Sequence, residues 1–451
     1  MLHLLVFILV FEHLIIAQIK SGPMLGHIEL RTAKIWCEVT SGTKVELNYW
    51  SAQDPKSIKT AFKTQNKFLN FETVLFDLVE LEPGTNYFYQ IVQNNKLRLN
   101  AFAGNFATQE LWQWRKPPPD FSFITGSCFY QNEPVYDRPG KPYGSDSTII
   151  LSMAKENSKF MLWLGDSWYT REVDYGSEWG LWYRASKDRS SEFLQPFLKS
   201  MSHYAIWDDH DFGPNNEGVS YIFKNESRNV FRSYFANPTY GMNNEGVYTK
   251  LSYNDIDLFL MDNRTWRSSD DMPTIIDGHW NPNKKMFGEE QLNWLQNALL
   301  NSTATFKIIV TGSQVLNELS TNDCMTHYPI EKKELLDFLT YSKVNGVLFI
   351  TGDRHLSEIN KLSRDSLYTL YDVTVSSLTA GISKIKKEEV DNPNRVPNTL
   401  IQEHNYARFN FTGNAKERLL TIEFMDKFGK NKSSFEISEN DLKNKKKSKD
   451  K

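Results

Sequence analysis

Residues 160–169 read Phe-Met-Leu-Trp-Leu-Gly-Asp-Ser-Trp-Tyr. The five apolar residues at the start are typical of a short buried strand, and the Gly-Asp that follows marks its end. Other short apolar runs end in the same abrupt way, at residues 121–125, 257–261, 306–311 and 346–351. We therefore expect a core of short buried strands whose ends carry glycine and polar residues.

Helical patterns lie between these strands, at residues 290–300 and 331–339. Their leucines recur at the spacing of one helical face: Leu292, Leu295, Leu299, Leu335, Leu336 and Leu339. Strands that alternate with helices predict a layered α/β domain. In such folds the ligand site gathers at the C-terminal ends of the strands.

The chain before this region reads as all-β from about residue 25 to residue 108. In Ala33–Val39 the residues alternate as in a half-buried strand, and Val45, Leu47 and Tyr49 repeat the pattern. Residues 81–91 contain a Pro-Gly turn followed by a further strand. Short strands at this spacing predict a small β-sandwich. The run of prolines in residues 114–120 predicts a stiff linker after it.

The composition is that of a globular protein. The chain has 451 residues, which favours two folded units, and 40% of them are hydrophobic, which is enough to bury a core. A formal net charge of -3 makes binding to nucleic acid through a basic surface a poor hypothesis.

The two ends of the chain differ from the rest. Residues 1–17 form an apolar run that ends at Ala17 and predicts a cleaved secretory signal, with a buried N-terminal strand or helix as the alternative. No other stretch is long and apolar enough for a transmembrane helix, so we expect a soluble mature protein. Residues 444–451 are basic and lack apolar side chains, which is typical of a solvated tail.

Unusual polar residues gather at the strand ends. They occur in four segments: Thr125-Gly-Ser-Cys-Phe129, Leu164-Gly-Asp-Ser-Trp-Tyr169, Ile206-Trp-Asp-Asp-His-Asp-Phe-Gly-Pro-Asn-Asn216 and Thr351-Gly-Asp-Arg-His355. A hydrolytic two-metal centre needs carboxylate and imidazole ligands from different strands, and one carboxylate that bridges both ions. Asp166 is placed to bridge, while Asp209, His210, Asp353 and His355 are suited to complete the centre.

Two further side chains favour a transition metal. Tyr169 can supply a phenolate to ferric iron, and Cys128 can supply a thiolate. The three cysteines, Cys37, Cys128 and Cys324, are too few for a disulfide framework, so at least one thiol is unpaired.

Each of these residues also has a structural interpretation. A Gly-Asp after a strand is usually a turn, a buried cysteine is usually a small core residue, and Tyr169 more often packs than binds a metal. The Asp-Asp-His-Asp segment at 208–211 is different, because crowded carboxylates repel one another and require a cation unless the loop is fully solvated. The apolar residues 204–207 before it argue against a solvated loop.

Taken together, the segments resemble the alkaline phosphatase D (PhoD-like) family of metallophosphoesterases. The four segments follow the order of that family, as do Asp262-Asn-Arg264 and Gln291-x-x-Trp-Leu295. Residues 137–143, Asp-Arg-Pro-Gly-Lys-Pro-Tyr, are similar to its secreted bacterial branch. The resemblance implies a layered α/β metallophosphoesterase domain, with a β-sandwich core flanked by helices, after a small all-β domain of fibronectin-III or immunoglobulin type.

The expected boundaries follow from the sequence and the resemblance together. They are a signal peptide at 1–17, a fibronectin-III-like sandwich at 22–110, a Pro-rich linker at 111–119, a PhoD-like metallophosphatase domain at 120–425, and a polar, basic tail at 426–451.

The resemblance also implies roles for single residues. Iron would be bound by Cys128, Asp166, Tyr169 and His355, and Asp166 would bridge to one or more calcium ions. Asp209 matches a position where related phosphoesterases have a metal-binding asparagine, and Asp353 would be a further metal ligand. Either Asn215 or Asn216 matches a calcium-binding asparagine. His210 would assist the leaving group or stabilise the transition state. Ferric iron and calcium are the expected cofactors, with other divalent metals as alternatives.

Arg264 and Arg267 are candidates for phosphate contacts, because a guanidinium group can bind two phosphate oxygens. An ion pair with nearby acids such as Asp262 is the equally weighted alternative.

The sequence thus predicts a secreted phosphoesterase that hydrolyses phosphate monoesters, diesters or both by attack of a metal-activated hydroxide. One alternative is a non-catalytic, metal-containing protein that binds a polymer through the aromatic residues 179–183, and another is a structural protein stabilised by calcium. The aromatic insert at 168–183 would line the site or form a local core. We expect a phosphate-ester substrate, no nucleic acid as a structural partner, and a monomer.

Overall fold

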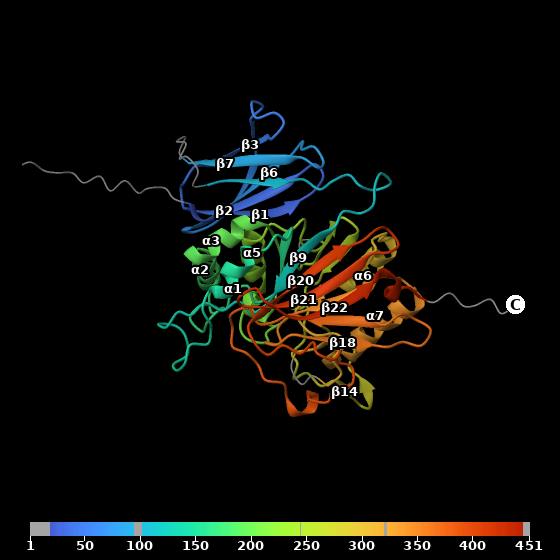
Figure 1. Ribbon diagram of the computed structural model, residues 1–451. Helices are drawn as coiled ribbons and strands as arrows, with labels where there is room; N and C mark the ends of the chain where they lie inside the picture. The colour runs from blue at the N-terminus through green and yellow to red at the C-terminus, as the bar shows by residue number, and fades with distance from the viewer. Residues whose placement is uncertain (1–18, 94–101, 244, 320–322, 445–451) are drawn as a thin grey trace, which may run out of the picture.

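The structure is a computed structural model that describes residues 19–93, 102–243, 245–319 and 323–444 (Figure 1). The predicted signal peptide at 1–17 and the last residues of the basic tail lie outside the described residues.

The larger sheet has ten strands. Their order is β22 (Asn431–Ser438), β21 (Leu419–Asp426), β20 (Asn405–Thr412), β9 (Phe121–Gly126), β10 (Phe160–Leu164), β11 (Ser202–Ile206), β1 (Ile19–Ile28), β2 (Ala33–Thr40), β6 (Phe71–Leu78) and β5 (Phe62–Phe68). Strands β9, β10 and β11 run parallel, so their C-terminal ends lie at one edge of the sheet.

The second sheet has six strands, ordered β12 (Thr249–Tyr253), β13 (Ile256–Leu260), β16 (Phe306–Thr311), β17 (Val347–Thr351), β19 (Leu370–Thr374) and β18 (Glu358–Leu362). Here β13, β16, β17 and β19 are parallel. The short strands predicted from the apolar runs are therefore confirmed as the inner strands of two sheets.

The two sheets pack face to face around an aromatic core. The ring of Phe123 in β9 stacks on Phe160 and Phe409 at centroid distances of 4.8 and 4.9 Å. The same apolar cluster includes Leu258 of β13 and Ile308 of β16 from the other sheet. This arrangement agrees with the expected β-sandwich core.

Helices cover the outer faces of both sheets. On the six-stranded sheet they are α6 (Glu289–Asn301) and α7 (Pro329–Tyr341). On the ten-stranded sheet they are α1 (Thr148–Met153), α2 (Glu178–Arg189), α3 (Gln195–Ser200) and α5 (Lys224–Tyr234), which appear in green in Figure 1. Leu292, Leu295 and Leu299 are buried as their spacing predicts, whereas Leu336 is only partly buried.

The N-terminal strands form a sandwich of their own. Strands β1, β2, β6 and β5 face a smaller sheet of β4 (Lys59–Thr60), β3 (Val45–Ser51), β7 (Asn86–Gln93) and β8 (Ala103–Ala107) around a separate apolar cluster. Strand β1 also pairs with β11, so this sandwich shares a sheet with the rest of the protein. Its assignment as a separate fibronectin-III-like domain remains a prediction.

The alternation predicted for β2 is incomplete, because both faces of the strand are covered. Trp36 is buried and its indole N–H donates a hydrogen bond to the carbonyl of Ser233 in α5 at 2.7 Å. Glu38 is also buried and accepts a hydrogen bond from Ser186 of α2. The N-terminal sandwich is therefore packed closely against the helices.

The boundary at residue 425 is wrong. Strand β22 pairs with β21 from Leu419↔Ser438 to Met425↔Asn431, and the helical turn η4 (Glu439–Leu442) follows it. The side chains of Ile437 and Leu442 are buried in the main core. The polar residues of this strand hid its alternation, since only one face contacts the core.

Among the helices of the described residues, none is long and apolar enough to cross a lipid bilayer. Shorter elements complete the chain: α4 (Asp209–Phe212), β14 (Ile275–Ile276), β15 (His279–Trp280), and the helical turns η1 (Glu192–Leu194), η2 (Met325–His327) and η3 (Lys387–Glu389).

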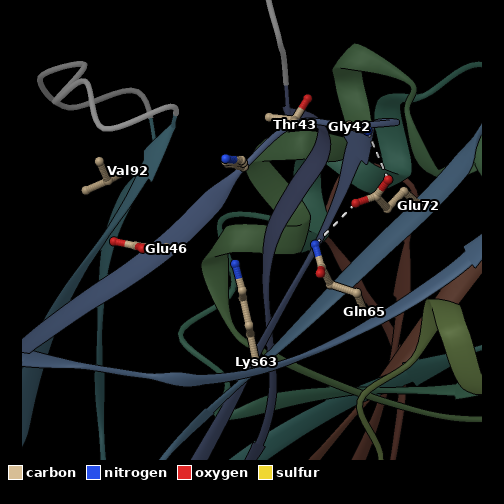
Figure 2. Close-up of a pocket in the computed structure, with 8 residues that line it drawn as sticks. Gly42, Thr43, Glu46, Lys63, Gln65, Glu72 and Val92 are labelled. Carbon is tan, nitrogen blue, oxygen red and sulfur yellow. Dashed lines mark hydrogen bonds between the residues drawn. The ribbon is translucent and has the colours of Figure 1, made fainter.

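A hollow of about 350 Å³ lies on the N-terminal sandwich, and several of the polar groups that line it are hydrogen-bonded (Figure 2). Glu72 accepts hydrogen bonds from the backbone N–H of Gly42 and from the Gln65 amide, at 3.1 and 3.2 Å. The Lys63 ammonium donates to the carbonyl of Val45. None of these residues belongs to the strand-end segments singled out in the sequence.

The aromatic core makes a specific prediction for stability. Replacing Phe123 by Ala should lower the free energy of unfolding by about 3–5 kcal/mol, because the buried ring leaves a cavity between the two sheets. Urea unfolding would measure this as a fall in the midpoint concentration. The matched control is Phe428→Ala, since Phe428 is 71% exposed and its loss should change the free energy by no more than about 0.5 kcal/mol. Equal shifts in the two variants would contradict the packing described.

Candidate metal centre

The strand-end residues singled out in the sequence converge in space. Cys128 follows β9, Asp166 follows β10, Asp209 follows β11 and Asp353 follows β17. These strands belong to two different sheets, and their C-terminal ends meet at one edge of the sandwich. The parallel direction of the strands places their last residues together.

Three overlapping groups of side chains have the spacing of metal ligands. They are Cys128 with Asp166 and His355, then Asp166 with Asp209 and His210, then Asp208 with Asp209 and Asp353. Within each group the ligand atoms lie within 4.8 Å of one another. Asp166 and Asp209 each belong to two groups, so each can connect neighbouring ions. This geometry agrees with the bridging position expected for Asp166.

The backbone at these residues is in the left-handed region. The φ angles are 61° at Cys128, 53° at Asp166, 60° at Asp353 and 55° at His355. Non-glycine residues rarely adopt such angles, and those that do often lie at functional sites where the surrounding structure holds them. Since the ligand atoms of each group lie within 4.8 Å of one another, these turns bring the side chains together at the common edge.

Glycines next to the ligands allow the strand ends to approach. A Cβ on Gly312, after β16, would lie 2.1 Å from the Oδ2 atom of Asp208. A Cβ on Gly165 would lie 2.6 Å from the Cβ of Asp208, and Gly165 also has a φ of +92°. Any side chain at either position would displace Asp208 from the centre.

The chemistry of the first group fits a transition metal. The Cys128 thiol is fully buried, and burial raises its pKa to about 12. Its sulfur lies 3.6 Å from Asp166 Oδ2 and accepts a hydrogen bond from the Ser376 hydroxyl at 3.1 Å. The buried Tyr169 hydroxyl lies beside the Cys128 sulfur and has no oxygen or nitrogen hydrogen-bond partner among the described residues, although a buried phenol normally has one. A cation at this position would satisfy both groups.

The carboxylates repel one another strongly. Burial, followed by the charges of Asp209 and Cys128, holds the pKa of Asp166 well above its usual value. Burial and the charge of Asp208 raise the pKa of Asp353 to about 8. Positive charge near such groups would return these pKa values to the ordinary range. The thiol, carboxylate and imidazole groups gathered here are therefore suited to hold metal ions.

Asp211 has a different role from its neighbours in the Asp-Asp-His-Asp segment. Its carboxylate accepts hydrogen bonds from the backbone N–H groups of Asp166, Ser167 and Asp208, and from the Ser167 hydroxyl. It thereby fastens the turn after β10 to the turn after β11. One of the crowded carboxylates is thus structural and does not call for a cation.

Arg264 supplies part of the positive charge that the segment requires. Its guanidinium group is fully buried and pairs with Asp208 at 2.5 Å and with Asp323 at 2.6 Å. Arg267 is also buried and pairs with Asp323 at 2.7 Å and with Asp270 at 2.9 Å. Both arginines therefore form the ion pairs that the sequence analysis gave as the alternative to phosphate binding, but with Asp208, Asp323 and Asp270 in place of Asp262. A phosphate contact by either one remains a prediction.

His210 and the two asparagines lie at the open side of the centre. The His210 ring stacks on Tyr169 at a centroid distance of 4.1 Å, and its Nδ1 atom has no hydrogen-bond partner among the described residues. The backbone N–H of Asn216 donates to Asp209 at 2.8 Å, whereas Asn215 lines the adjoining pocket. Metal binding by one of the two, Asn215 or Asn216, remains a prediction.

A pocket of about 620 Å³ opens beside these residues. Tyr169 and His210 form part of its wall. Within the aromatic insert 168–183, Tyr169 and Tyr175 line the pocket, while Trp168, Leu181 and Trp182 are buried in an apolar cluster. The insert therefore both lines the pocket and contributes to a local apolar core.

Comparison with known proteins identifies the family. The model described as PhoD-like phosphatase matches residues 142–422, which is more than half of the chain. The chain belongs to the PhoD-like phosphatase family. The resemblance seen in the strand-end segments is thereby confirmed. A separate model, described as a domain of unknown function (DUF7800), matches residues 16–107, which cover the strands of the N-terminal sandwich.

Individual relatives of this PhoD-like chain are distant. Alkaline phosphatase D of Bacillus subtilis (strain 168) is 22% identical over 329 residues, which cover 63% of this chain and 53% of that protein. The chain thus spans about half the length of the curated relative it matches. A solved structure of PhoD has a TM-score of 0.72 at 17% identity, over 93% of this chain and 89% of the other.

The fold extends beyond this family. A purple acid phosphatase isolated from yellow lupin (Lupinus luteus) seeds has a TM-score of 0.66 at 12% identity, over 93% of this chain and 75% of that one. At such low identity the likeness concerns the fold alone. It agrees with a metallophosphoesterase fold for the PhoD-like chain.

Some residues of the PhoD-like centre were not found from the sequence. Asn263 donates a hydrogen bond to Asp208 at 2.9 Å, and its own Oδ1 atom is buried without a partner among the described residues. Asp323 neutralises both arginines but follows no strand, so no sequence pattern indicates it. Asp208 was noticed only as part of the acidic segment, with no role of its own.

The ion pairs of Arg264 predict a structural effect. Arg264→Gln should lower the free energy of unfolding of the metal-free protein by about 3–5 kcal/mol, because Asp208 and Asp323 would be left buried without a counter-ion. Thermal or urea unfolding measures the loss. Arg138→Gln is the control, since the side chain of Arg138 is 87% exposed and its pair with Glu172 should contribute less than about 1 kcal/mol. An Arg264→Gln protein of normal stability with only a raised KM would instead support a direct phosphate contact.

Proposed function

We propose that this protein is a secreted, metal-dependent phosphoesterase that hydrolyses phosphate monoesters, diesters or both. The observation that carries the proposal is the set of three ligand groups that share Asp166 and Asp209 in a PhoD-like chain. Secretion is supported by the apolar residues 1–17, which end in a small residue.

The donor types support iron at one end of the centre and calcium at the other. Cys128, Asp166, Tyr169 and His355 combine a thiol, a phenol and an imidazole, which suit a transition metal. Asp209 and Asp353, with Asn215 or Asn216, supply oxygen atoms, which calcium prefers. Asp166 stands between the two sets because it belongs to the first two ligand groups.

Bound metal ions would supply Lewis acidity toward the phosphate oxygens and toward a water molecule. The protein's own residues then fix the geometry of the reaction. Asp166 and Asp209 each belong to two ligand groups and so link neighbouring groups. Asp211 accepts a hydrogen bond from the backbone N–H of Asp166 and so fixes the turn that carries it. Arg264 fixes Asp208 and so holds the third ligand group in place.

His210 is the residue best placed to act on the leaving group. It lies in the pocket wall, its ring is oriented by stacking on Tyr169, and its Nδ1 atom has no partner among the described residues. We assign it a hydrogen bond from its ring N–H to the oxygen of the departing alcohol, which stabilises the negative charge that develops on that oxygen. A hydrogen bond positioned in this way contributes about 10²–10³-fold to a rate.

The alternative of a non-catalytic polymer-binding protein has less support. Of the aromatic residues in 179–183, Trp182 is buried and Trp179 stacks on Tyr183 at 5.2 Å, so they pack within α2 and against β6. This segment offers one half-exposed ring, that of Trp179, and no aromatic platform.

The metal content of defined variants tests the proposed centre. Protein purified without chelator should contain iron and calcium, measured by mass spectrometry, and should hydrolyse p-nitrophenyl phosphate or its diester in a calcium-dependent manner. Cys128→Ser should lose iron and keep calcium. Asp166→Asn should lose both, because Asp166 belongs to two ligand groups, and its activity should fall by about 100-fold or more.

The control variant is Asp146→Asn, which removes an exposed carboxylate that pairs with Lys427. It should keep both metals and full activity. A folded parent protein that binds no metal and hydrolyses neither ester would overturn the proposal and favour a binding role.

A further inference from the structure

The side chains of the metal centre are held in place by different means. The Nδ1–H of His355 donates a hydrogen bond to the carbonyl of Gly381 at 2.5 Å, which orients the imidazole ring. The Tyr169 hydroxyl has no oxygen or nitrogen partner of this kind among the described residues. Metal ligands depend on outer partners that fix their direction. Contacts elsewhere on Tyr169 must therefore hold its phenol in place.

The Tyr169 ring is held between two other rings. It stacks on His210 at a centroid distance of 4.1 Å and meets Tyr130 edge to face at 5.0 Å. Tyr130 belongs to the connection between β9 and α1, whereas Tyr169 belongs to the connection between β10 and α2. The direction of the phenol thus depends on how these two connections are fastened to each other.

Arg171 fastens them. Its guanidinium group donates hydrogen bonds to the backbone carbonyl of Tyr169 and, at 2.6 Å, to that of Gln131. It also pairs with Asp137 at 3.0 Å and lies over the ring of Tyr130 at 4.1 Å from the centroid. The Arg171 side chain is only 4% exposed. One buried group therefore holds both the backbone of Tyr169 and the ring that packs against it.

Arg171 is itself fixed from both sides. Its backbone N–H donates to Asp174 at 2.8 Å, and Asp174 pairs with the fully buried Arg184 of α2 at 2.8 Å. On the other side, Asp137 also accepts a hydrogen bond from the Tyr130 hydroxyl at 2.6 Å. The contacts of Arg171 with Tyr169 and Tyr130 are thus built on a rigid base.

The arrangement requires the shape of an arginine. A guanidinium group is a planar fork with five N–H donors, so it can bond the two carbonyls and the Asp137 carboxylate while it stacks on the Tyr130 ring. A lysine at this position would keep the charge but not the fork. The neighbouring pair of Arg138 with Glu172 joins the same two connections, but through side chains that are 87% and 54% exposed.

We propose that Arg171 is a positioning residue that holds the Tyr169 phenol at the metal centre before an ion binds. The inference rests on the proposed function, since it concerns the phenol assigned there to iron. Arg171 acts through the backbone of Tyr169 and the ring of Tyr130, and not on the phenol oxygen. Without it, Cys128, Asp166 and His355 would still bind iron, but the phenol would no longer be fixed toward the ion.

Resonance Raman spectroscopy of the iron-loaded full chain tests this role. Excitation in the visible charge-transfer band of ferric iron enhances phenolate ring vibrations only where the phenolate is bound to the ion. In Arg171→Met loaded with excess ferric iron, the phenolate signal per bound iron and kcat for p-nitrophenyl phosphate should each fall by about tenfold. Tyr169→Phe sets the zero of the signal. An undiminished signal per iron in Arg171→Met would overturn the proposal.

A conservative variant separates positioning from a contribution to stability alone. Arg171→Lys keeps the charge beside Asp137, but its phenolate signal per iron should still fall well below that of the parent protein. A Lys variant with the thermal stability and the full signal of the parent would overturn the proposal, and this variant decides the question if Arg171→Met does not fold. Arg138→Gln is the matched control and should keep the full signal and kcat, because its pair is exposed.

The same measurements distinguish this inference from the proposed function. A parent protein that binds iron without a signal dependent on Tyr169 would refute both the phenol as a ligand and the role of Arg171. A signal that persists in both Arg171 variants would support the proposed centre and refute the positioning role. A signal that depends on Arg171, in a parent protein that hydrolyses neither ester, would refute the enzyme and support the positioning role.

Discussion

The mutual repulsion of buried carboxylates at one edge of the sandwich is the constraint on which the rest of the site depends. Asp166, Asp208, Asp209 and Asp353 lie close together, and burial, followed by the charges of neighbouring groups, raises the pKa values of Asp166 and Asp353. Arg264 offsets part of this charge and Asp211 is satisfied by backbone N–H groups, but the remainder requires cations. A chain that buries these groups together is built to hold metal ions.

The fold supplies the positions for this charge. Parallel strands in two stacked sheets bring the C-terminal ends of β9, β10, β11 and β17 to one place, although they are far apart in the sequence. Left-handed backbone at Cys128, Asp166 and His355 then turns the side chains toward each other. Glycines at 165 and 312 leave room for Asp208. Stability and ligand geometry thus depend on the same turns.

The sequence predicts those parts of the site that depend on strand ends. Asp166, Asp209 and His355 could be found because each follows a short apolar run that ends abruptly. The pairs of Arg264 with Asp208 and Asp323 could not, since they join residues more than fifty positions apart that no local pattern connects. Strand β22 was missed because its exposed polar residues concealed its alternation, and the pairing of β1 with β11 was missed because parallel pairing leaves no turn between the strands.

The central claim is that the three ligand groups hold metal ions with Asp166 and Asp209 shared between them. A crystal structure of protein purified without chelator, with anomalous data collected on both sides of the iron absorption edge, tests this most directly. We expect an iron peak bonded to Cys128, Asp166, Tyr169 and His355, and a second ion, without an iron edge, that shares Asp166 and is bonded to Asp209. Carboxylates bonded only to Arg264 and to each other, with no metal density between them, would contradict the account.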